Sequence, residues 1–252
     1  MSKIDTKTKV IGVSEVSSIL IVISILFVAT FLRSALGFGD ALLAMPFLIL
    51  LVGLQTATPL VALVGSTISL TLLVNEWRTL DLRGIWQLIL TTFLGIPFGL
   101  LLLRLAPEAL AKACLGTLLI LYALYQLLGL SVPQIRHPAW TVIFGFIAGI
   151  FGGAYNTSGA VIVVYGTLRN WEPDYFRINL QGYFLLTNWL IVVGHGLAGL
   201  WTPTVFQLFL YSIPGVVIGA WVGGAISKRI PKATFSQLIY ALLLVIGIVF
   251  VV

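Results

Sequence analysis

Long apolar stretches recur along the whole of this chain, and no other feature limits its fold as strongly. They are separated by short polar or charged stretches and do not gather in one tail or leader. A helix of about 20 apolar residues is long enough to cross the hydrocarbon core of a bilayer. Of all residues, 60% are hydrophobic and 9% are charged, whereas soluble domains carry about 25% charged residues. The sequence therefore predicts an all-α, polytopic integral membrane protein.

Two of the apolar segments are too short to cross a bilayer comfortably. These are 40–52 and 158–168, and each directly follows a glycine-rich stretch. We expect each to be a half-helix or a re-entrant element whose broken backbone is covered by protein. The other segments lie near 16–34, 57–75, 84–104 and 108–128 in the first half, and near 139–153, 176–195, 203–225 and 234–252 in the second.

The two sets of segments resemble each other. Placing Phe38-Gly39-Asp40 over Tyr155-Asn156-Thr157 also places Gly65 over Gly182 without a gap. We therefore expect one transmembrane domain over 1–252, with one repeat at about 14–130 and a second at about 139–252. An odd number of crossings in each half inverts the second repeat relative to the first. If only one of the first two segments of each half fails to span, the repeats are parallel instead.

Charge, cysteine content and motifs exclude several classes of function. The formal net charge is +6, with Lys and Arg scattered singly or in pairs, which is typical of the positively charged flanks of membrane helices. Nucleic-acid binding would need a continuous basic face on a soluble fold. Cys114 is the only cysteine, and no HExxH, GxSxG, Walker or paired-carboxylate motif occurs. We therefore expect neither an enzyme nor a metal or other cofactor.

The glycine-rich stretches are the best candidates for a binding site. A break in a helix exposes backbone N–H groups at the start of the next helix, where the positive end of the helix dipole also attracts an anion. Close helix packing is the alternative reason for small residues at these positions. The candidate ligands are Gly37 and Gly39 in the first half, and Gly152, Gly153, Asn156, Thr157, Ser158 and Gly159 in the second.

Arg33 precedes the first of these stretches and is the most costly residue if it lies in hydrocarbon, at roughly 2.5 to 3.5 kcal/mol. One interpretation is a fixed positive charge that faces an anion. The others are an ion pair with nearby Asp40, or a side chain that extends from the helix end to the interface. Because Asp40 would repel an anion, we expect it to be paired or to become protonated.

Polar residues of the helix after the second break complete the candidate set. We expect Gln181 to bind substrate and Asn179 to face the same cavity, because an amide in hydrocarbon needs a partner; hydrogen bonding between helices is the alternative. Asn188 falls opposite Thr71 when Gly65 and Gly182 are aligned. His195 could relay a proton, or it could be a polar residue at a helix end. Asp40, Asn179, Asn188 and His195 are thus candidates for coupling or structure.

These motifs together resemble the TauE/SafE sulfite exporter family. Each half opens with a glycine-rich segment, Gly37-Phe38-Gly39 or Phe151 to Gly159, and closes with a Gly-xxx-Gly helix and a basic loop that contains proline. The resemblance extends from about Val16 to the end of the chain. This sequence departs from the family pattern at Asp40, where a third glycine is common, and after Gly159, where a proline often follows.

The resemblance implies a secondary transporter in the cell (inner or plasma) membrane that exports sulfite or a small organosulfonate such as sulfoacetate. Its partners would be a small anionic substrate and the lipid bilayer, with no nucleic acid, and a homo-oligomer stays open. The alternatives are an anion channel and a transporter of a small carboxylate without sulfur. In the transporter, the two broken segments would meet near the membrane midplane, and either protons or the membrane potential could drive transport.

Overall fold

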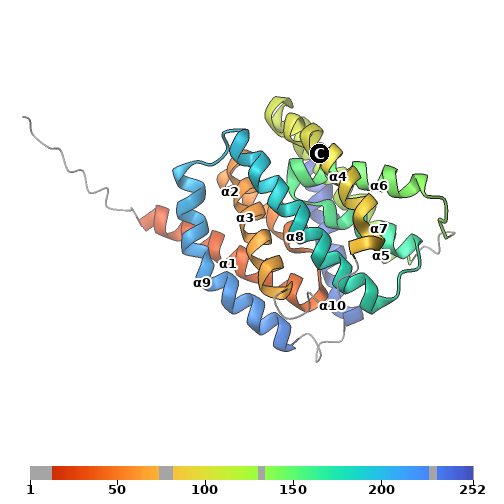
Figure 1. Ribbon diagram of the computed structural model, residues 1–252. Helices are drawn as coiled ribbons and strands as arrows, with labels where there is room; N and C mark the ends of the chain where they lie inside the picture. The colour runs from red at the N-terminus through yellow and green to blue at the C-terminus, as the bar shows by residue number, and fades with distance from the viewer. Residues whose placement is uncertain (1–12, 74–81, 130–133, 227–231, 252) are drawn as a thin grey trace, which may run out of the picture.

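The computed structural model describes residues 13–73, 82–129, 134–226 and 232–251. Within these ranges the chain forms ten α-helices and no strand (Figure 1). The prediction of an all-α fold is confirmed. The helices are α1 (Val13–Leu36), α2 (Asp40–Val52), α3 (Leu54–Leu73), α4 (Leu82–Leu105), α5 (Glu108–Leu127), α6 (Ala139–Tyr155), α7 (Ser158–Leu168), α8 (Pro173–Leu197), α9 (Pro203–Ile226) and α10 (Lys232–Val251).

Both short helices have the bounds predicted from the sequence. Gly37 and Gly39 have φ angles of 93° and 101°, which glycine adopts without steric cost, and they separate α1 from α2. Asn156, with φ 56° and ψ 19°, ends α6 in the left-handed conformation. The second break is narrower than the glycine-rich stretch suggested. The helix α6 runs on through Gly152 and Gly153, so only Asn156 and Thr157 separate it from α7.

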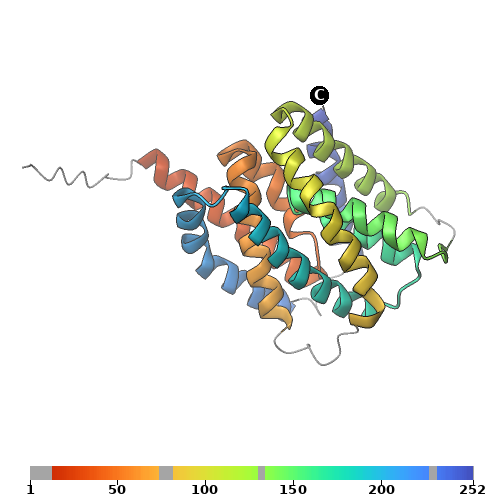
Figure 2. The ribbon, with the colours of Figure 1, turned by 45° about the horizontal axis from the view of Figure 1, so that its top comes forward.

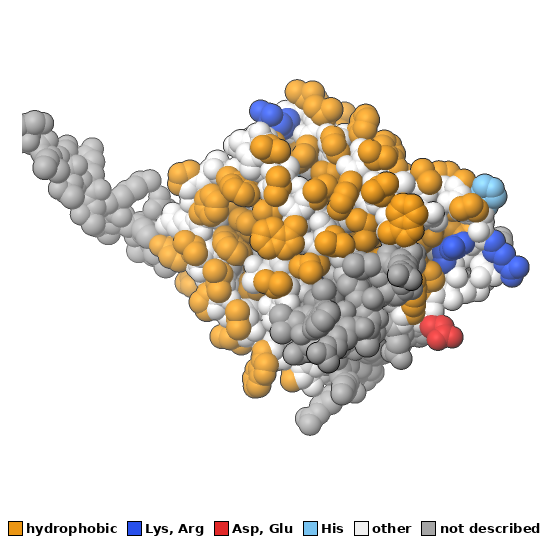
Figure 3. Space-filling view, in the orientation of Figure 1, with side chains coloured by type: hydrophobic (Ala, Val, Ile, Leu, Met, Phe, Trp, Pro, Cys, Tyr) orange, Lys and Arg blue, Asp and Glu red, His pale blue; other side chains and the backbone are white. Residues whose placement is uncertain are grey.

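The length and composition of the helices suit a bilayer. Among the described residues, four segments are long and apolar enough to cross a membrane: Ser17–Ala35, Leu54–Thr71, Ile85–Leu105 and Pro203–Ile226. Apolar side chains cover much of the surface seen in Figure 3. Trp221 on α9, for example, is 76% exposed. An apolar exterior without a soluble partner is what lipid contact requires, so the chain is a polytopic membrane protein.

Glycines allow two helix pairs to pack at backbone contact. Gly95 of α4 lies against Phe146 and Gly149 of α6, and Gly99 lies against Ile150 one turn later. A Cβ atom at either glycine would overlap a carbonyl oxygen of α6. Because the residue numbers rise together, α4 and α6 run parallel. Close approach through small residues is how helices associate in lipid, where no hydrophobic force drives them together.

The same arrangement joins α1 to α9. A Cβ atom at Gly219 of α9 would lie 2.8 Å from the carbonyl oxygen of Phe27, and one at Gly223 would lie 2.5 Å from that of Phe31. These numbers also rise together, so α1 and α9 run parallel. The helix before each break is therefore held by a glycine-bearing helix of the other half of the chain.

Two further helix pairs run antiparallel. Gly116 of α5 packs against Phe250 of α10, whereas Tyr122 of α5 contacts Tyr240, with ring centroids 5.9 Å apart. In the centre of the molecule, α3 and α8 lie side by side (Figures 1 and 2). Their contacts include Gly65 with Asn188 and the cluster of Ala62 with Ile191 and Val192. The central pair α3 and α8 thus presents its polar residues to both breaks.

Candidate functional site

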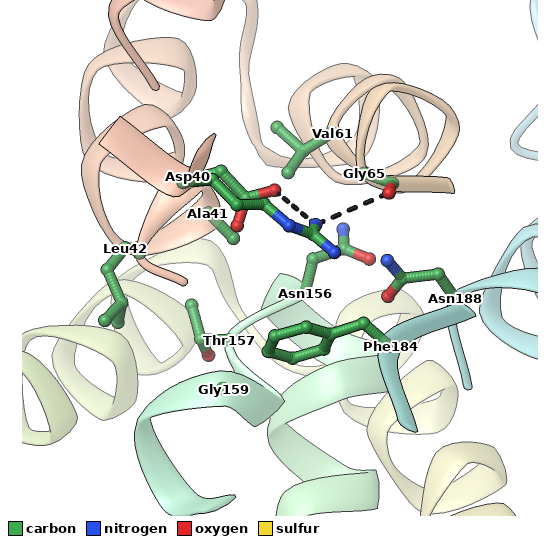
Figure 4. A pocket seen from close by; sticks show the side chains of 12 residues that line it. Asp40, Ala41, Leu42, Val61, Gly65, Asn156, Thr157, Gly159, Phe184 and Asn188 are labelled. Atoms are coloured by element: carbon green, nitrogen blue, oxygen red, sulfur yellow. Dashed lines mark hydrogen bonds and ion pairs between the residues drawn. The ribbon is translucent and has the colours of Figure 1, made fainter. Parts of the chain in front are cut away.

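A small cavity of about 20 Å³ lies where the two breaks meet the central helices (Figure 4). Residues of five helices and of the α6–α7 link surround it. They are Arg33 of α1, Gly39, Asp40, Ala41 and Leu42 at the start of α2, Val61 and Gly65 of α3, Asn156, Thr157 and Gly159 at the start of α7, and Phe184 and Asn188 of α8. The structure therefore brings both breaks to one place.

The cavity lies at the N-terminal ends of both short helices. Neither the N-cap of α2, Gly39, nor that of α7, Thr157, makes a side-chain capping hydrogen bond. The first N–H groups of a helix have no partner within the helix and act as donors to whatever lies in front of them. Two positive dipole ends also converge there. The backbone alone thus makes this cavity favourable for negative charge.

Arg33 supplies the only positive side chain among the described residues that line the cavity, and it is 1% exposed. Its Nη1 donates to Asp40 Oδ2 at 2.8 Å and to the Gly65 carbonyl oxygen at 3.4 Å. Its Nη2 donates to Ser69 Oγ at 2.5 Å and to Gln181 Oε1 at 3.3 Å. The guanidinium therefore stays inside the protein, and the interpretation of a side chain that extends to the interface was wrong.

Two features of the Arg33 guanidinium leave part of its positive charge without a hydrogen-bonding or ionic partner. The guanidinium carbon lies 4.7 Å from the centroid of the Phe184 ring, and an aromatic face attracts a cation without neutralising it. The Nε atom is buried and has no hydrogen-bond partner among the described residues. A buried donor without a partner is costly. Four hydrogen bonds and the contact with Phe184 thus hold Arg33 in place. Its Nε–H is a donor without a partner among the described residues.

Asp40 forms the ion pair with Arg33, as one of the interpretations proposed. It is the first residue of α2, where a carboxylate is stabilised by the helix dipole. Figure 4 shows Asp40, Asn156 and Asn188 pointing toward one another across the cavity. The first break therefore contains one positive and one negative side chain, and their charges sum to zero.

Gln181 joins the first break to α8. Its Nε2 donates to the Gly37 carbonyl oxygen at 2.6 Å, and its Oε1 accepts from Arg33. The left-handed conformation of Gly37 exposes that carbonyl oxygen after the end of α1. Gln181 lies behind Arg33 and outside the cavity lining, so it orients the guanidinium.

Asn156 joins the second break to α3. Its Nδ2 donates to the Thr58 carbonyl oxygen at 2.6 Å, whereas its Oδ1 is buried and has no hydrogen-bond partner among the described residues. The left-handed backbone conformation that it adopts is one that asparagine tolerates better than most residues. Gly159, one turn into α7, would place a Cβ atom 2.9 Å from the Phe184 ring. Glycine here lets the ring stand next to Arg33.

Five predicted ligands do not line the cavity: Gly37, Gly152, Gly153, Ser158 and Gln181. A Cβ atom at Gly153 would lie 2.5 Å from the Ile96 carbonyl oxygen, and one at Gly152 would lie 3.2 Å from Ile191. Both glycines therefore serve helix packing, which was the alternative interpretation. Ser158 is buried at the start of α7.

Asn179 and His195 also lie away from the cavity. Asn179 Nδ2 donates to the Tyr175 carbonyl oxygen within its own helix. His195 is fully buried, and its Nε2 lies 3.3 Å from the Gly153 carbonyl oxygen. His195 lies in the last turn of α8, as the helix-end interpretation proposed, but it is buried and does not face the membrane interface. The histidine instead links α8 to the end of α6.

Three residues of the site, Gly65, Ser69 and Phe184, were not singled out as ligands from the sequence. Their spacing was the available signal. Gly65 and Ser69 follow Val61 at intervals of four residues on α3, and Phe184 lies between Gln181 and Asn188 at helical spacing on α8. Residues at these intervals share one face of a helix. The central helices thus direct one face each toward Arg33.

The cavity is small in this conformation. A volume of about 20 Å³ has room for about one water molecule, which is less than a polyatomic anion needs. A second cavity of about 360 Å³ lies at the α2–α3 and α4–α5 links, lined by Val52–Thr56, Leu103 and Ala106. On α3, Thr58 lies between the residues that line the two cavities.

A polar cavity between two interrupted helices in a polytopic membrane protein is typical of membrane transporters. The protein is a membrane transporter. More specifically, the chain belongs to the sulfite exporter TauE/SafE family, whose family model matches residues 22–250. The family predicted from the glycine-rich segments is confirmed. No curated protein and no solved structure matches the chain.

Proposed function

We propose that this protein is a secondary transporter that exports sulfite or a small organosulfonate such as sulfoacetate across the cell membrane. One observation carries the proposal: the N-termini of α2 and α7 and the buried Arg33 surround a single cavity. The match to the sulfite exporter TauE/SafE family supports the choice of a sulfur anion.

The donors around the cavity suit the sulfite or sulfonate group. Such a group carries three oxygen atoms around one sulfur and therefore accepts hydrogen bonds from several directions. The starts of α2 and α7 supply backbone N–H groups from two sides, and Arg33 supplies a guanidinium that can bind two oxygen atoms in one plane. The amides of Asn156 and Asn188 would fix the orientation of the anion.

The halves 14–130 and 139–252 act as inverted repeats in this proposal. Helices at corresponding places in the two halves, α3 with α8 and α5 with α10, pack antiparallel, and α1 on α9 corresponds to α6 on α4. A two-fold axis in the membrane plane relates antiparallel counterparts, whereas an axis along the membrane normal relates parallel ones. These contacts therefore support inversion, and alternating access follows if one half rocks against the other.

The small size of the cavity supports a carrier over a channel. A channel needs a continuous polar lining across the membrane. Here the apolar side chains of Leu42, Val61 and Phe184 are part of the lining, and the cavity has room for about one water molecule. A polyatomic anion can occupy the site only when it widens.

Counterflow in proteoliposomes tests the proposal. The purified protein is reconstituted, the vesicles are loaded with unlabelled anion, and uptake of labelled sulfite, sulfoacetate, sulfate or acetate is measured. We expect saturable counterflow of sulfite or sulfoacetate. Counterflow of acetate alone would mean that the substrate is a carboxylate and not a sulfur anion. Ion currents far above carrier turnover would indicate a channel. Failure of every sulfur anion would contradict the proposed substrate class.

A further inference from the structure

The cavity assigned to an anion already contains one, the carboxylate of Asp40. We propose that Asp40 is an internal counter-anion: the substrate displaces it from Arg33, and it returns when the substrate leaves, so that the empty transporter reorients with a neutral site. This inference rests on the proposed function because it needs a mobile anion.

The position of Asp40 is that of a bound anion. Its Oδ2 lies 2.8 Å from Arg33 Nη1, and the residue stands at the N-terminus of α2, where the helix dipole favours negative charge. A free anion in the cavity would be attracted by the same two groups, the Arg33 guanidinium and the N-terminus of α2. The carboxylate and the substrate therefore compete for one place.

Among the described residues at the cavity, only the carboxylate of Asp40 neutralises the charge of Arg33. Arg33 and Asp40 are the only charged residues among those described as lining it. The packed helix α3 contains no ionisable side chain, and α2 contains none besides Asp40. On the stretch of α8 from Gln181 to Asn188 the only ionisable side chain is Tyr183, whose hydroxyl bonds Thr92 Oγ1 at 2.9 Å. No other described group at the cavity can neutralise Arg33 when Asp40 is absent.

Substrate binding can release Asp40 without leaving Arg33 unpaired. Arg33 Nε is buried without a hydrogen-bond partner among the described residues, so the guanidinium has one donor that no protein group occupies when an anion arrives. The two helix N-termini, each equivalent to roughly half a positive charge, then offset the additional negative charge. The loaded site is therefore tolerated with both anions present.

Loss of the Asp40 charge should affect only one half of the transport cycle. In an Asp40→Asn variant, the empty site would contain a buried guanidinium without a counter-ion, which is strongly unfavourable. Reorientation of the empty transporter would then be slow. The loaded site would contain Arg33 and the substrate as a neutral pair, and its reorientation would continue. The variant should exchange anions but should not carry out net efflux.

The experiment compares these two modes with labelled sulfite in proteoliposomes. Counterflow is measured with sulfite on both sides, and net efflux is measured into buffer without a transported anion. For Asp40→Asn we expect counterflow within about twofold of the wild type and net efflux reduced about a hundredfold, the factor that an uncompensated buried charge implies. Glu172→Gln, which removes an exposed carboxylate at the start of α8, is the matched control and should leave both rates unchanged.

The outcomes separate the inference from the function on which it rests. If Asp40→Asn lowers counterflow and net efflux equally, or lowers neither, the inference is wrong while the wild-type protein remains a transporter. If the wild-type protein itself shows no counterflow of any sulfur anion, the proposed function fails and the inference fails with it. Asp40→Ser, whose hydroxyl also suits a helix N-terminus, is the second neutral variant and must behave as Asp40→Asn does.

Discussion

The two helix breaks of this transporter share a backbone plan and differ in their charge. Both place the N-terminus of a short helix at one cavity. The first break contributes Arg33 and Asp40, whose ion pair measures 2.8 Å. The second contributes Asn156, which has no charge and bonds the backbone of α3. The two helix N-termini thus supply backbone donors from both halves of the chain, and the side chains of the first half alone supply the ionic pair.

The helices that precede the breaks differ as well. At the second break, α6 packs on α4 so closely that Cβ atoms at Gly145, Gly149 and Gly153 would contact or overlap the backbone of α4. At the first break the contact is slightly less close: Cβ atoms at Gly219 and Gly223 of α9 would lie 2.8 and 2.5 Å from carbonyl oxygens of α1, and one at Gly215 would lie 3.3 Å from a side-chain atom of Ile23, whereas one at Gly149 would lie 2.2 Å from the Thr92 carbonyl oxygen. We infer that α6 and α4 form the more rigid framework, against which the charged first break moves.

The largest effect is expected from removing the charge of the first break. Arg33→Gln leaves Asp40 buried without its partner, a loss of about 3 to 5 kcal/mol, and removes the guanidinium from the site. Sulfite counterflow should fall below detection. Counterflow assays, with the melting temperature measured by intrinsic fluorescence, separate loss of binding from loss of folding.

Arg33→Lys sharpens that result because it keeps the charge and loses the planar fork. The ammonium can still pair with Asp40, but it cannot contact Asp40, Gly65, Ser69 and Gln181 together as the guanidinium does. Counterflow should be intermediate between the wild type and Arg33→Gln. Equal activity of Arg33→Lys and the wild type would mean that only the charge matters.

The second prediction compares the packing of the two halves. Gly149→Ala places a methyl group on the Thr92 carbonyl oxygen of α4, and overpacking of this kind costs about 1 to 3 kcal/mol. Gly215→Ala, at the looser α1–α9 contact, should cost less, and Gly224→Ala, which has no neighbour within 4 Å, should cost least. Melting temperatures of the three variants in detergent measure this order. A reversed order would contradict a more rigid α4–α6 pair.

The smallest effect is expected at the second break. Asn156→Gly keeps the left-handed backbone conformation at no steric cost and removes the hydrogen bond to Thr58. A single hydrogen bond contributes about 1 kcal/mol, so the KM for sulfite counterflow should rise about fivefold while the protein stays folded. A change as large as that of Arg33→Gln would show that the uncharged break also carries essential binding energy.

Much of the fold was predictable because local sequence features determine where each of the short helices begins. The bounds of α2 and α7 follow from Gly39 and Asp40 on one side and from Thr157 and Ser158 on the other. The location of the second break was less predictable. Gly152 and Gly153 could end a helix or pack within one, and only the backbone of α4 next to Gly153 decides for packing.

The composition of the site was predictable only in part. Arg33, Asp40 and Gln181 stand out because charge and amides in apolar segments need partners, and the structure shows that they contact one another. Phe184 does not stand out, because phenylalanine is common in membrane helices and its contact with Arg33 depends on how α8 is rotated. The roles of these residues as substrate ligands remain predictions.

The central claim is that one anion binds between the two helix N-termini beside Arg33. Crystals grown with selenite, a sulfite analogue whose selenium scatters anomalously, test it most directly. The account predicts an anomalous peak within hydrogen-bonding reach of the Arg33 guanidinium and of the first backbone N–H groups of α2 and α7. A peak only in the larger cavity at the α2–α3 link, lined by Gln55 and Thr56, would contradict it.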